Sequence, residues 1–408
     1  MGNPINGTQI ILGVTGSIAA YKGVEIASTL TKQGALVDTV LTESAEEFIS
    51  PLTFQSVSGR KAYTQKDLWG TQGHVVHISL ARKAGLIIIA PASANTIAKI
   101  AHGIADNLLA VTVLAARCPI LIAPAMDAGM YSNPATQLNV AKLKERGFTF
   151  IGPESGHLAS GLKGPGRMTE PADIIAHVRY MLSRQNQLQG KHIVVTAGGT
   201  AEAADPVRIL TNRSTGKQGY ALAQAALDAG SDVTLISAPS HLAPPAGASL
   251  IEIESAAEMN DAVLESIPSA DALIMAAAVA DFRPANFVSE KIKKSAKLTQ
   301  LDLERTEDIL QNVAKLKSQK KLELKVVGFA AESENLKENA REKMHKKKMD
   351  MIVANDISDP EAGFGVDTNK VLLMYSDGST EQLPKMKKIE VAEKVLQHLS
   401  SWLIEGVA

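Results

Sequence analysis

Short apolar runs alternate with longer amphipathic stretches along the chain. The first part contains five such runs, all rich in β-branched residues: QIILGV (9–14), ALVDTVL (35–41), GLIIIA (85–90), PILIAP (119–124) and FTFIG (148–152). Apolar runs of this length, separated by stretches of helical period, are typical of buried parallel strands joined by crossover helices. The pattern predicts an α/β fold built on a doubly wound parallel sheet.

A polar stretch, SRQNQLQG (183–190), interrupts this pattern. The apolar runs then resume as HIVVTAGG (192–199), DVTLIS (232–237), DALIMAA (271–277), LKVVGFA (324–330) and DMIVAND (350–356), and VLLMYSDGSTEQL (371–383) has the form of a hairpin. A chain of 408 residues is also longer than one hydrophobic core usually serves. We therefore predict two doubly wound, Rossmann-like domains, residues 1–185 and residues 191–408.

Charge and cysteine content narrow the class of partner. The 42 Lys and Arg residues nearly balance the 43 Asp and Glu residues, so no overall field favours nucleic acid or an anionic membrane. Cys118 is the single cysteine, which excludes a disulfide framework and a cysteine-built zinc site and fits a reducing cytoplasm. No apolar stretch approaches the ~18 residues of a membrane span. Small-molecule ligands in the cytoplasm are the expected partners.

The turn after the first run is a candidate phosphate site. Gly16 permits a tight turn, and Ser17 is placed to cap the following helix, whose free N–H groups can hold a phosphate. The GxGxxG fingerprint of dinucleotide sites is missing, so FMN or another monophosphate is favoured over NAD or FAD. A strand–glycine–helix joint without a ligand is the structural alternative.

Polar residues also gather after the third apolar run. Ser93, Asn95, Thr96 and Asn107 follow a strand end, which is where open α/β sheets bind ligands. Helix capping accounts for Ser93 but not readily for the density of the group.

Four segments, in order, resemble the flavin-dependent cysteine decarboxylases: PASANT (91–96), ADNLL (105–109), PAMDAGMY (124–131) and GHLASGLKGPGRM (156–168). The resemblance spans roughly residues 8–180. It implies a flavodoxin-like flavoprotein fold, a substrate-clamping loop at 156–168, and FMN that oxidises a substrate thiol before CO2 is lost. The implied FMN-binding residues are Gly16, Ser17, Ser93, Asn95, Thr96 and Asn107.

The same resemblance places a catalytic base at His77, in HVVHISLAR, with His74 as the alternative. A histidine suits proton transfer near neutral pH. Two positions depart from the family: Asp127 replaces its usual asparagine, and Ser160 replaces its usual clamp cysteine. If Asp127 were kept neutral by burial, it would supply the acid that Ser160 cannot, and the two departures would share one explanation.

The second half opens with TAGGTAEAADPVRILTNRSTGKQG (196–219), whose small and polar residues suit close approach of the backbone to phosphates. It is not a Walker loop, because GxxxxGK[ST] is absent. Three further segments stand out: AAAVADFRP (276–284), EKIKK (290–294) and GFAAE (328–332). In KMHKKK (343–348), Lys343 and Lys347 share one helical face, whereas Lys346 and Lys348 are interpreted as solvated.

These segments resemble the ligase domain of the bacterial bifunctional phosphopantothenoylcysteine decarboxylase / phosphopantothenate–cysteine ligases, over roughly residues 190–400. The resemblance implies that CTP with Mg²⁺ activates a carboxylate as an acyl-cytidylate, which the cysteine amine attacks. Lys291 is implied to neutralise the triphosphate and Asn212 to position the acyl intermediate. The implied CTP-binding residues are Ala277, Asp281, Lys291, Asp308, Ile309, Phe329, Lys343 and Lys347.

The sequence thus predicts a bifunctional enzyme of coenzyme A biosynthesis that ligates cysteine to 4′-phosphopantothenate and then decarboxylates the product. One alternative is an active ligase whose N-terminal half binds FMN but is catalytically altered. Another is a binding protein whose two nucleotide folds have lost catalysis. Residue chemistry leaves open CTP or ATP and the metal ligands. The resemblance further implies homo-oligomers, with a trimeric flavin half and a dimeric ligase half.

Overall fold

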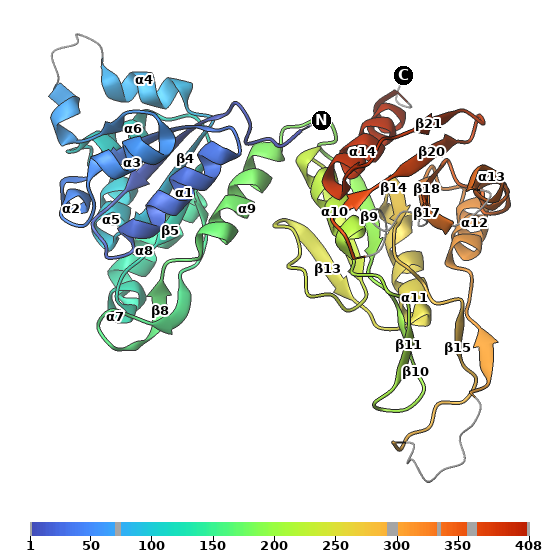
Figure 1. Ribbon diagram of the computed structural model, residues 1–408. Helices are drawn as coiled ribbons and strands as arrows, with labels where there is room; N and C mark the ends of the chain where they lie inside the picture. The colour runs from blue at the N-terminus through green and yellow to red at the C-terminus, as the bar shows by residue number, and fades with distance from the viewer. Residues whose placement is uncertain (1, 70–74, 292–300, 333–335, 357–364, 406–408) are drawn as a thin grey trace. The chain divides into compact units, whose positions relative to one another are not determined.

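The computed structural model describes residues 2–69, 75–291, 301–332, 336–356 and 365–405 (Figure 1). The chain divides into two compact units, residues 3–182 and residues 183–408, and each unit has its own main sheet. Within the described ranges, no helix has both the length and the apolar character needed to cross a membrane.

The N-terminal unit is built on a six-stranded parallel sheet. Its strands, in spatial order, are β3 (Ala62–Tyr63), β2 (Leu36–Leu41), β1 (Gln9–Val14), β4 (Leu86–Ala92), β5 (Ile120–Pro124) and β6 (Thr149–Phe150). Apart from the two-residue edge strand β3, the strands follow the flavodoxin order 2-1-3-4-5. The predicted doubly wound, flavodoxin-like fold is confirmed, with its switch point between β1 and β4.

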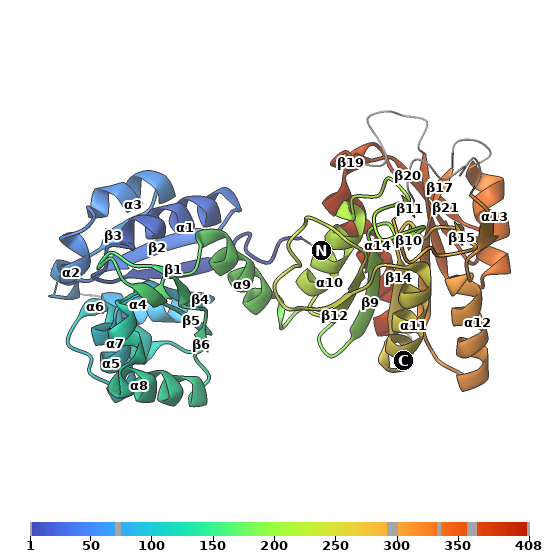
Figure 2. The same cartoon turned by 90° about the horizontal axis from the view of Figure 1, so that it is seen from below.

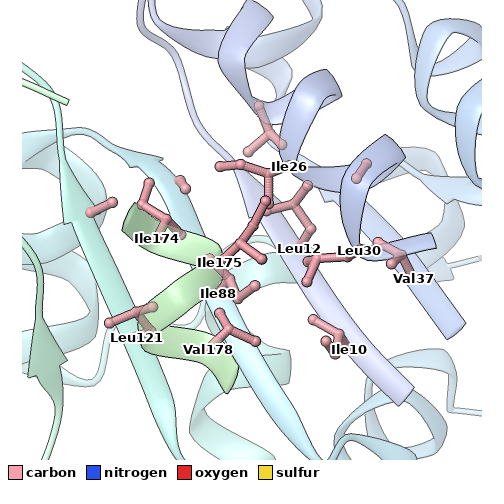
Figure 3. Close-up of a cluster of buried hydrophobic side chains, with 14 of the residues drawn as sticks. Ile10, Leu12, Ile26, Leu30, Val37, Ile88, Leu121, Ile174, Ile175 and Val178 are labelled. Carbon is pink, nitrogen blue, oxygen red and sulfur yellow. The ribbon is translucent and has the colours of Figure 1, made fainter. Parts of the chain in front are cut away.

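Helices cover both faces of this sheet. One face carries α1 (Ala20–Lys32), α3 (Pro51–Ser58) and α9 (Pro171–Ser183); the other carries α4 (Val76–Lys83), α5 (Ala94–His102), α6 (Leu108–Ala115) and α8 (Pro134–Glu145). Figure 3 shows Ile26 and Leu30 of α1 and Val178 of α9 meeting the strand side chains Leu12 and Ile88. All five are fully buried, which is worth roughly 1.5–3 kcal/mol per side chain.

A short helix and a hairpin lie beyond the carboxyl end of β5. Helix α7 spans Ala128–Ser132, and the antiparallel strands β7 (Glu154–His157) and β8 (Lys163–Arg167) form the hairpin. Gly166 of β8 crosses so close to the backbone that an added Cβ would lie 2.2 Å from the Met126 carbonyl oxygen. The Met126 N–H donates to the Gly166 carbonyl at 3.0 Å. Only glycine allows this crossing, which fixes the hairpin against α7.

The C-terminal unit is built on an eight-stranded sheet. Its spatial order is β13 (Ala248–Glu252), β12 (Asp232–Ser237), β9 (His192–Ala197), β14 (Ala272–Met275), β17 (Lys325–Glu332), β18 (Met351–Asp356), β20 (Val371–Tyr375) and β21 (Thr380–Gln382). The first six strands are parallel and run in the Rossmann order 3-2-1-4-5-6. β20 and β21 are antiparallel, which confirms the predicted hairpin.

Helices again cover both faces, as Figure 2 shows from below. Helices α10 (Lys217–Asp228) and α14 (Lys388–Glu405) pack together, while α11 (Ala256–Ser266), α12 (Ile309–Lys320) and α13 (Leu336–Lys346) join the core of the other face. Two small hairpins, β10–β11 (Ala201–Ala203, Ile209–Thr211) and β15–β16 (Phe282–Pro284, Leu303–Arg305), extend from the sheet side by side (Figure 1). The sequence pattern predicted neither hairpin.

Candidate active sites

The turn after β1 meets the end of β4 at the switch point of the N-terminal sheet. The Thr15 hydroxyl donates to the Pro91 carbonyl at 2.8 Å and accepts from the Ser93 N–H at 2.9 Å. At Gly16 an added Cβ would lie 2.5 Å from the Ser44 Cβ, so this position needs glycine. These contacts hold the turn after β1 and the loop after β4 together.

Ser17 does not cap α1 as predicted. The N-cap residue is Ala19, and no side chain caps the helix; the Ser17 Oγ accepts only from the Ala19 N–H, at 3.3 Å, ahead of the helix. No side chain accepts from the first N–H groups of this 13-residue helix; two of them, those of Ala20 and Lys22, donate to the Ser17 and Ala19 carbonyls at 3.0 Å. An uncapped helix start beside a serine hydroxyl fits the phosphate of FMN.

Helix capping explains two of the four polar residues that follow β4, whereas the sequence indicated it only for Ser93. Ser93 accepts from the Thr96 N–H at 3.3 Å at the start of α5, and Asn107 accepts from the Ala110 N–H at 2.9 Å at the start of α6. Thr96 is buried, whereas Asn95 is exposed. Two of the four polar residues are thus helix caps, and their part in binding FMN stays a prediction.

Asp127 and Ser160 contact each other directly. The Ser160 hydroxyl donates to Asp127 Oδ2 at 2.6 Å, and the Gly129 N–H donates to Asp127 Oδ1 at 2.9 Å. The hydrogen bond from Ser160, followed by that from Gly129, lowers the pKa of Asp127. The hypothesis that burial keeps this carboxyl neutral is therefore wrong: the group is solvated and accepts two hydrogen bonds, and both favour its ionised form.

This pair lines one cleft with the start of α1. The cleft encloses about 400 Å³ between α1, the end of β5 and the hairpin β7–β8, and Ser17 lies on its wall with Asp127 and Ser160. Three basic side chains that the sequence reasoning did not single out also line it: Lys22, His157 and Arg167. A lone lysine or arginine is read from sequence as a solvated residue, so nothing in the pattern marked them.

His77 lies elsewhere in the unit. It is the second residue of α4, and its Nδ1 is buried without a hydrogen-bond partner among the residues that the structure describes. Figure 1 shows α4 and the hairpin β7–β8 at opposite ends of the N-terminal unit. Within one copy, His77 is therefore not brought together with Asp127 and Ser160. The alternative base, His74, lies outside the described residues.

In the C-terminal unit, the loops after β9 and β14 meet at the switch point. The Asn212 amide donates to the Ala278 and Val279 carbonyls at 3.2 and 3.1 Å, and the Thr200 hydroxyl accepts from the Ala280 N–H at 2.9 Å. The side-chain nitrogen of Asn212 is thus used to join the two loops, at the carboxyl edge where such sheets bind ligands.

Helix α10 begins at the same edge. Its N-cap is Gly216, with φ +79°, and no side chain caps it. At Gly219 an added Cβ would lie 2.5 Å from the Ala197 Cβ, so α10 packs directly on β9. Residues 214–219 line a pocket of about 140 Å³ together with Phe329 and the buried Lys388. The helix start and this lysine make the pocket suited to an anion.

A larger cavity, of about 960 Å³, adjoins this pocket. Nearly all the residues predicted for the acyl intermediate and CTP line it: Asn212, Ala277, Asp281, Asp308, Ile309, Phe329, Lys343 and Lys347. They come from the loops after β9 and β14, from the start of α12, from β17 and from the end of α13. Segments far apart in the sequence therefore converge on one cavity.

Charge in this cavity is concentrated at the end of α13. Lys347 forms an ion pair with Asp308 at 3.2 Å, and Asp308 also caps α12 by accepting from the Gln311 N–H. Lys346, interpreted from sequence as solvated, lines the cavity beside Lys343 and Lys347. Lys346 is exposed, as that interpretation expects, and the Lys347 N–H donates to the Lys343 carbonyl at 3.0 Å, so Lys343 and Lys347 share one helical face.

Lys291 does not line the cavity; it is exposed at the end of a described range. Among the described residues, no group of three or more His, Cys, Asp or Glu side chains could hold a metal ion.

Comparison with known proteins assigns each of the two units to a protein family. A family model described as "Flavoprotein" matches residues 2–183, and one described as "DNA/pantothenate metabolism flavoprotein C-terminal domain" matches residues 188–403. The "Coenzyme A biosynthesis bifunctional protein CoaBC" of Bacillus subtilis (strain 168) is 45% identical over 400 residues, which cover 97% of this chain and 98% of that protein. The chain belongs to the family of bifunctional coenzyme A biosynthesis proteins.

A second member, from Vibrio cholerae serotype O1, is 42% identical over 392 residues, or 96% of this chain and 97% of its own length. Among solved structures, the C-terminal domain of a coenzyme A biosynthesis bifunctional protein CoaBC is 38% identical; the match covers 54% of this chain and all of that domain, with a TM-score of 0.46.

Like the other members of its family, this bifunctional coenzyme A biosynthesis protein is an enzyme with ligase and decarboxylase activities. Its N-terminal unit is a flavoprotein unit, and FMN is its cofactor. In that unit, the uncapped start of α1 and the glycine at position 16 fit a flavin phosphate.

Proposed function

We propose that the C-terminal unit joins cysteine to 4′-phosphopantothenate with CTP and Mg²⁺, and that the N-terminal unit decarboxylates the resulting 4′-phosphopantothenoylcysteine to 4′-phosphopantetheine. The observation that carries the ligase half is the single cavity that gathers Asn212, Asp281, Phe329 and three lysines at the switch point. Its volume of about 960 Å³ suits a nucleotide and an acyl chain together.

In the ligase reaction, a carboxylate oxygen of 4′-phosphopantothenate attacks the α-phosphorus of CTP, and pyrophosphate leaves. The cysteine amine then attacks the acyl carbon, loses a proton and displaces CMP. Lys343, Lys346 and Lys347 supply the positive charge that offsets the charge of the phosphates, with Lys291 as a further cation. Asn212 fixes the two loops between which the acyl group lies.

In the decarboxylase unit, Ser17 and the N–H groups at the start of α1 hold the flavin phosphate. Bound FMN supplies the oxidation of the substrate thiol that makes loss of CO2 possible. The hairpin β7–β8 covers the cleft, and Asp127 holds its tip through Ser160. His77 acts as the base that takes the thiol proton.

Assembly follows from where these residues lie. Helix α4, which carries His77, and the hairpin β7–β8, whose turn carries Ser160, lie at opposite ends of one N-terminal unit (Figure 1), so a site that uses both takes them from different copies. This supports the trimeric flavin half.

The ligase half has exposed apolar side chains on its two small hairpins, β10–β11 and β15–β16. Their exposed fractions lie between 45% and 62%, for Val207, Ile209, Phe282 and Phe287. This supports a dimeric ligase half that assembles through these hairpins. Light scattering coupled to size-exclusion chromatography tests both states.

The test of the ligase assignment is CMP release from purified protein supplied with 4′-phosphopantothenate, cysteine and either CTP or ATP. Release of CMP that requires both other substrates and Mg²⁺ supports the proposal. Release of AMP from ATP at an equal or higher rate contradicts the choice of nucleotide.

One observation favours a second function for the N-terminal unit. Its hydrogen bonds lower the pKa of Asp127, and Ser160 is a poor acid, so neither side chain is suited to supply the proton that completes the reduction. A unit without that proton source would stop at the ene-thiol, two hydrogens lighter than 4′-phosphopantetheine. Mass spectrometry of the product decides between the two, and the ratio of the two products should be the same for Asp127→Asn as for the parent.

A further inference from the structure

A buried lysine occupies the first turn of α1. Lys22 is the third residue of this helix and is only 8% exposed. A cation at this end faces the positive pole of the helix dipole, where anions are favoured, and its burial carries a desolvation cost. The stability of α1 therefore does not explain a lysine at this position.

The partners of Lys22 lie at the base of the hairpin β7–β8. Its ammonium donates to Glu170 Oε2 at 2.9 Å and to the Met168 carbonyl at 3.4 Å. Glu170 also accepts from Arg167, the last residue of β8, and its N–H donates to Glu154, the first residue of β7, at 3.4 Å. Lys22, and then Arg167, lower the pKa of Glu170, so this carboxylate is ionised.

The hairpin is thus held at two places. At its tip, Ser160 donates to Asp127; at its base, Glu170 joins both strands to α1. The start of α1 is the proposed flavin-phosphate turn, and Lys22 and Ser160 line the same cleft. Of these two contacts, the one at the base fixes the position of the hairpin relative to the start of α1, where the flavin phosphate is proposed to bind.

We propose that Lys22 is a positioning residue for the decarboxylase: through Glu170 it fixes the base of the hairpin β7–β8 relative to the flavin-phosphate turn, so that the hairpin holds the substrate over the cleft. This inference rests on the proposed function of the N-terminal unit.

A purely structural ion pair makes a different prediction. Glu170 is 40% exposed and stays solvated when Lys22 is replaced, so loss of the pair alone should cost little stability. A structural role would therefore show as a small fall in Tm, with hydrogen exchange rising throughout residues 3–182. A positioning role raises exchange in the hairpin alone.

The experiment compares Lys22→Met with Lys32→Met in the FMN-loaded full chain. Lys32 is in the last turn of the same helix and serves as the control. For Lys22→Met we expect amide exchange over residues 154–167 to rise about tenfold, and KM for 4′-phosphopantothenoylcysteine to rise about tenfold with kcat within about threefold. Lys22→Arg, which keeps the charge, should recover part of the KM change. Lys32→Met should match the parent.

Glu170→Gln should reproduce the effects of Lys22→Met, and the double variant should add little to either, because both act through one contact. Unchanged exchange in the hairpin, or a rise spread over the whole unit, would overturn the proposal. Amide hydrogen exchange is measured without turnover, so failure of the proposed role of Lys22 can be told apart from failure of the proposed function. A chain that releases no CO2 contradicts the proposed function alone, whereas normal CO2 release by Lys22→Met with parental KM contradicts the role of Lys22.

Discussion

Asp127 shows how far one side chain can be understood from sequence. Its departure from the family was visible, and so was that of Ser160, but the hydrogen bond between them was not, because 33 positions separate the two residues. That hydrogen bond and the one from the Gly129 N–H lower the pKa of Asp127, so they favour its ionised form over the neutral acid. The sequence singled out both residues, but it suggested a neutral Asp127, whereas the hydrogen bonds it accepts lower its pKa.

Ser160→Ala should raise the pKa of Asp127 toward its ordinary value, because the largest cause of the lowered pKa is removed. A lowered carboxyl pKa stabilises the fold above the ordinary value of 3.8, and this contribution is lost as pH falls through the folded-state pKa. In Ser160→Ala that loss should therefore occur at higher pH. A ¹³C NMR titration of labelled aspartate measures it, and an unchanged Asp127 titration would contradict the assignment.

Lys347→Gln should raise KM for CTP about tenfold, since one cation in the cavity is worth roughly 1.4 kcal/mol to an anionic ligand. Lys348→Gln is the control, because Lys348 is the next residue but does not line the cavity. Steady-state CMP release measures both variants. Equal effects of the two substitutions would mean that the cluster acts through overall charge and not through contact.

Among the elements, the long strands were predicted closely because buried β-branched runs are a strong local signal. β1 and β12 have the predicted bounds. The edge strand β13 was missed because its side chains are largely exposed, so its apolar pattern is weak. The short hairpins β10–β11 and β15–β16 depend on contacts distant in sequence, which periodicity does not report.

Gly166→Ala should impair the decarboxylase and leave the ligase unchanged, because the added Cβ would lie 2.2 Å from a backbone oxygen and displace β8. Overpacking of this kind costs about 1–3 kcal/mol. Gly129→Ala is the control, since its Cβ would meet only Asp127 Oδ1, at an ordinary 3.4 Å. Rates of CO2 release from the two variants, with CMP release as the internal reference, provide the comparison. A parental rate from Gly166→Ala would mean that the hairpin is not part of the site.

For the whole molecule, the structure gives each unit its own sheet, core and ligand-binding edge. Family membership could be predicted because ordered motifs cover most of the chain. The gathering of the cavity residues at one sheet edge followed from the Rossmann order. The basic cleft residues Lys22 and Arg167 could not be predicted, because only tertiary packing brings α1 against the hairpin.

Two variants should have reciprocal effects. His77→Asn should abolish CO2 release while CMP release continues, and Lys291→Gln should largely abolish CMP release while the flavin spectrum stays unchanged. Each substitution removes a group from one unit only. Separate assays of CMP, of CO2 from supplied 4′-phosphopantothenoylcysteine and of visible absorption measure the outcome. Loss of both activities in either variant would contradict independent sites.

The most direct test of the account follows a carboxyl carbon through both reactions. The full chain is supplied with cysteine labelled with ¹⁴C in its carboxyl group, together with 4′-phosphopantothenate, CTP and Mg²⁺, and released ¹⁴CO2 is counted. We predict release that stops when either CTP or 4′-phosphopantothenate is omitted, because the decarboxylase acts on the product of the ligase. Label that accumulates in the amide without release of ¹⁴CO2, or release that needs no CTP, would contradict it.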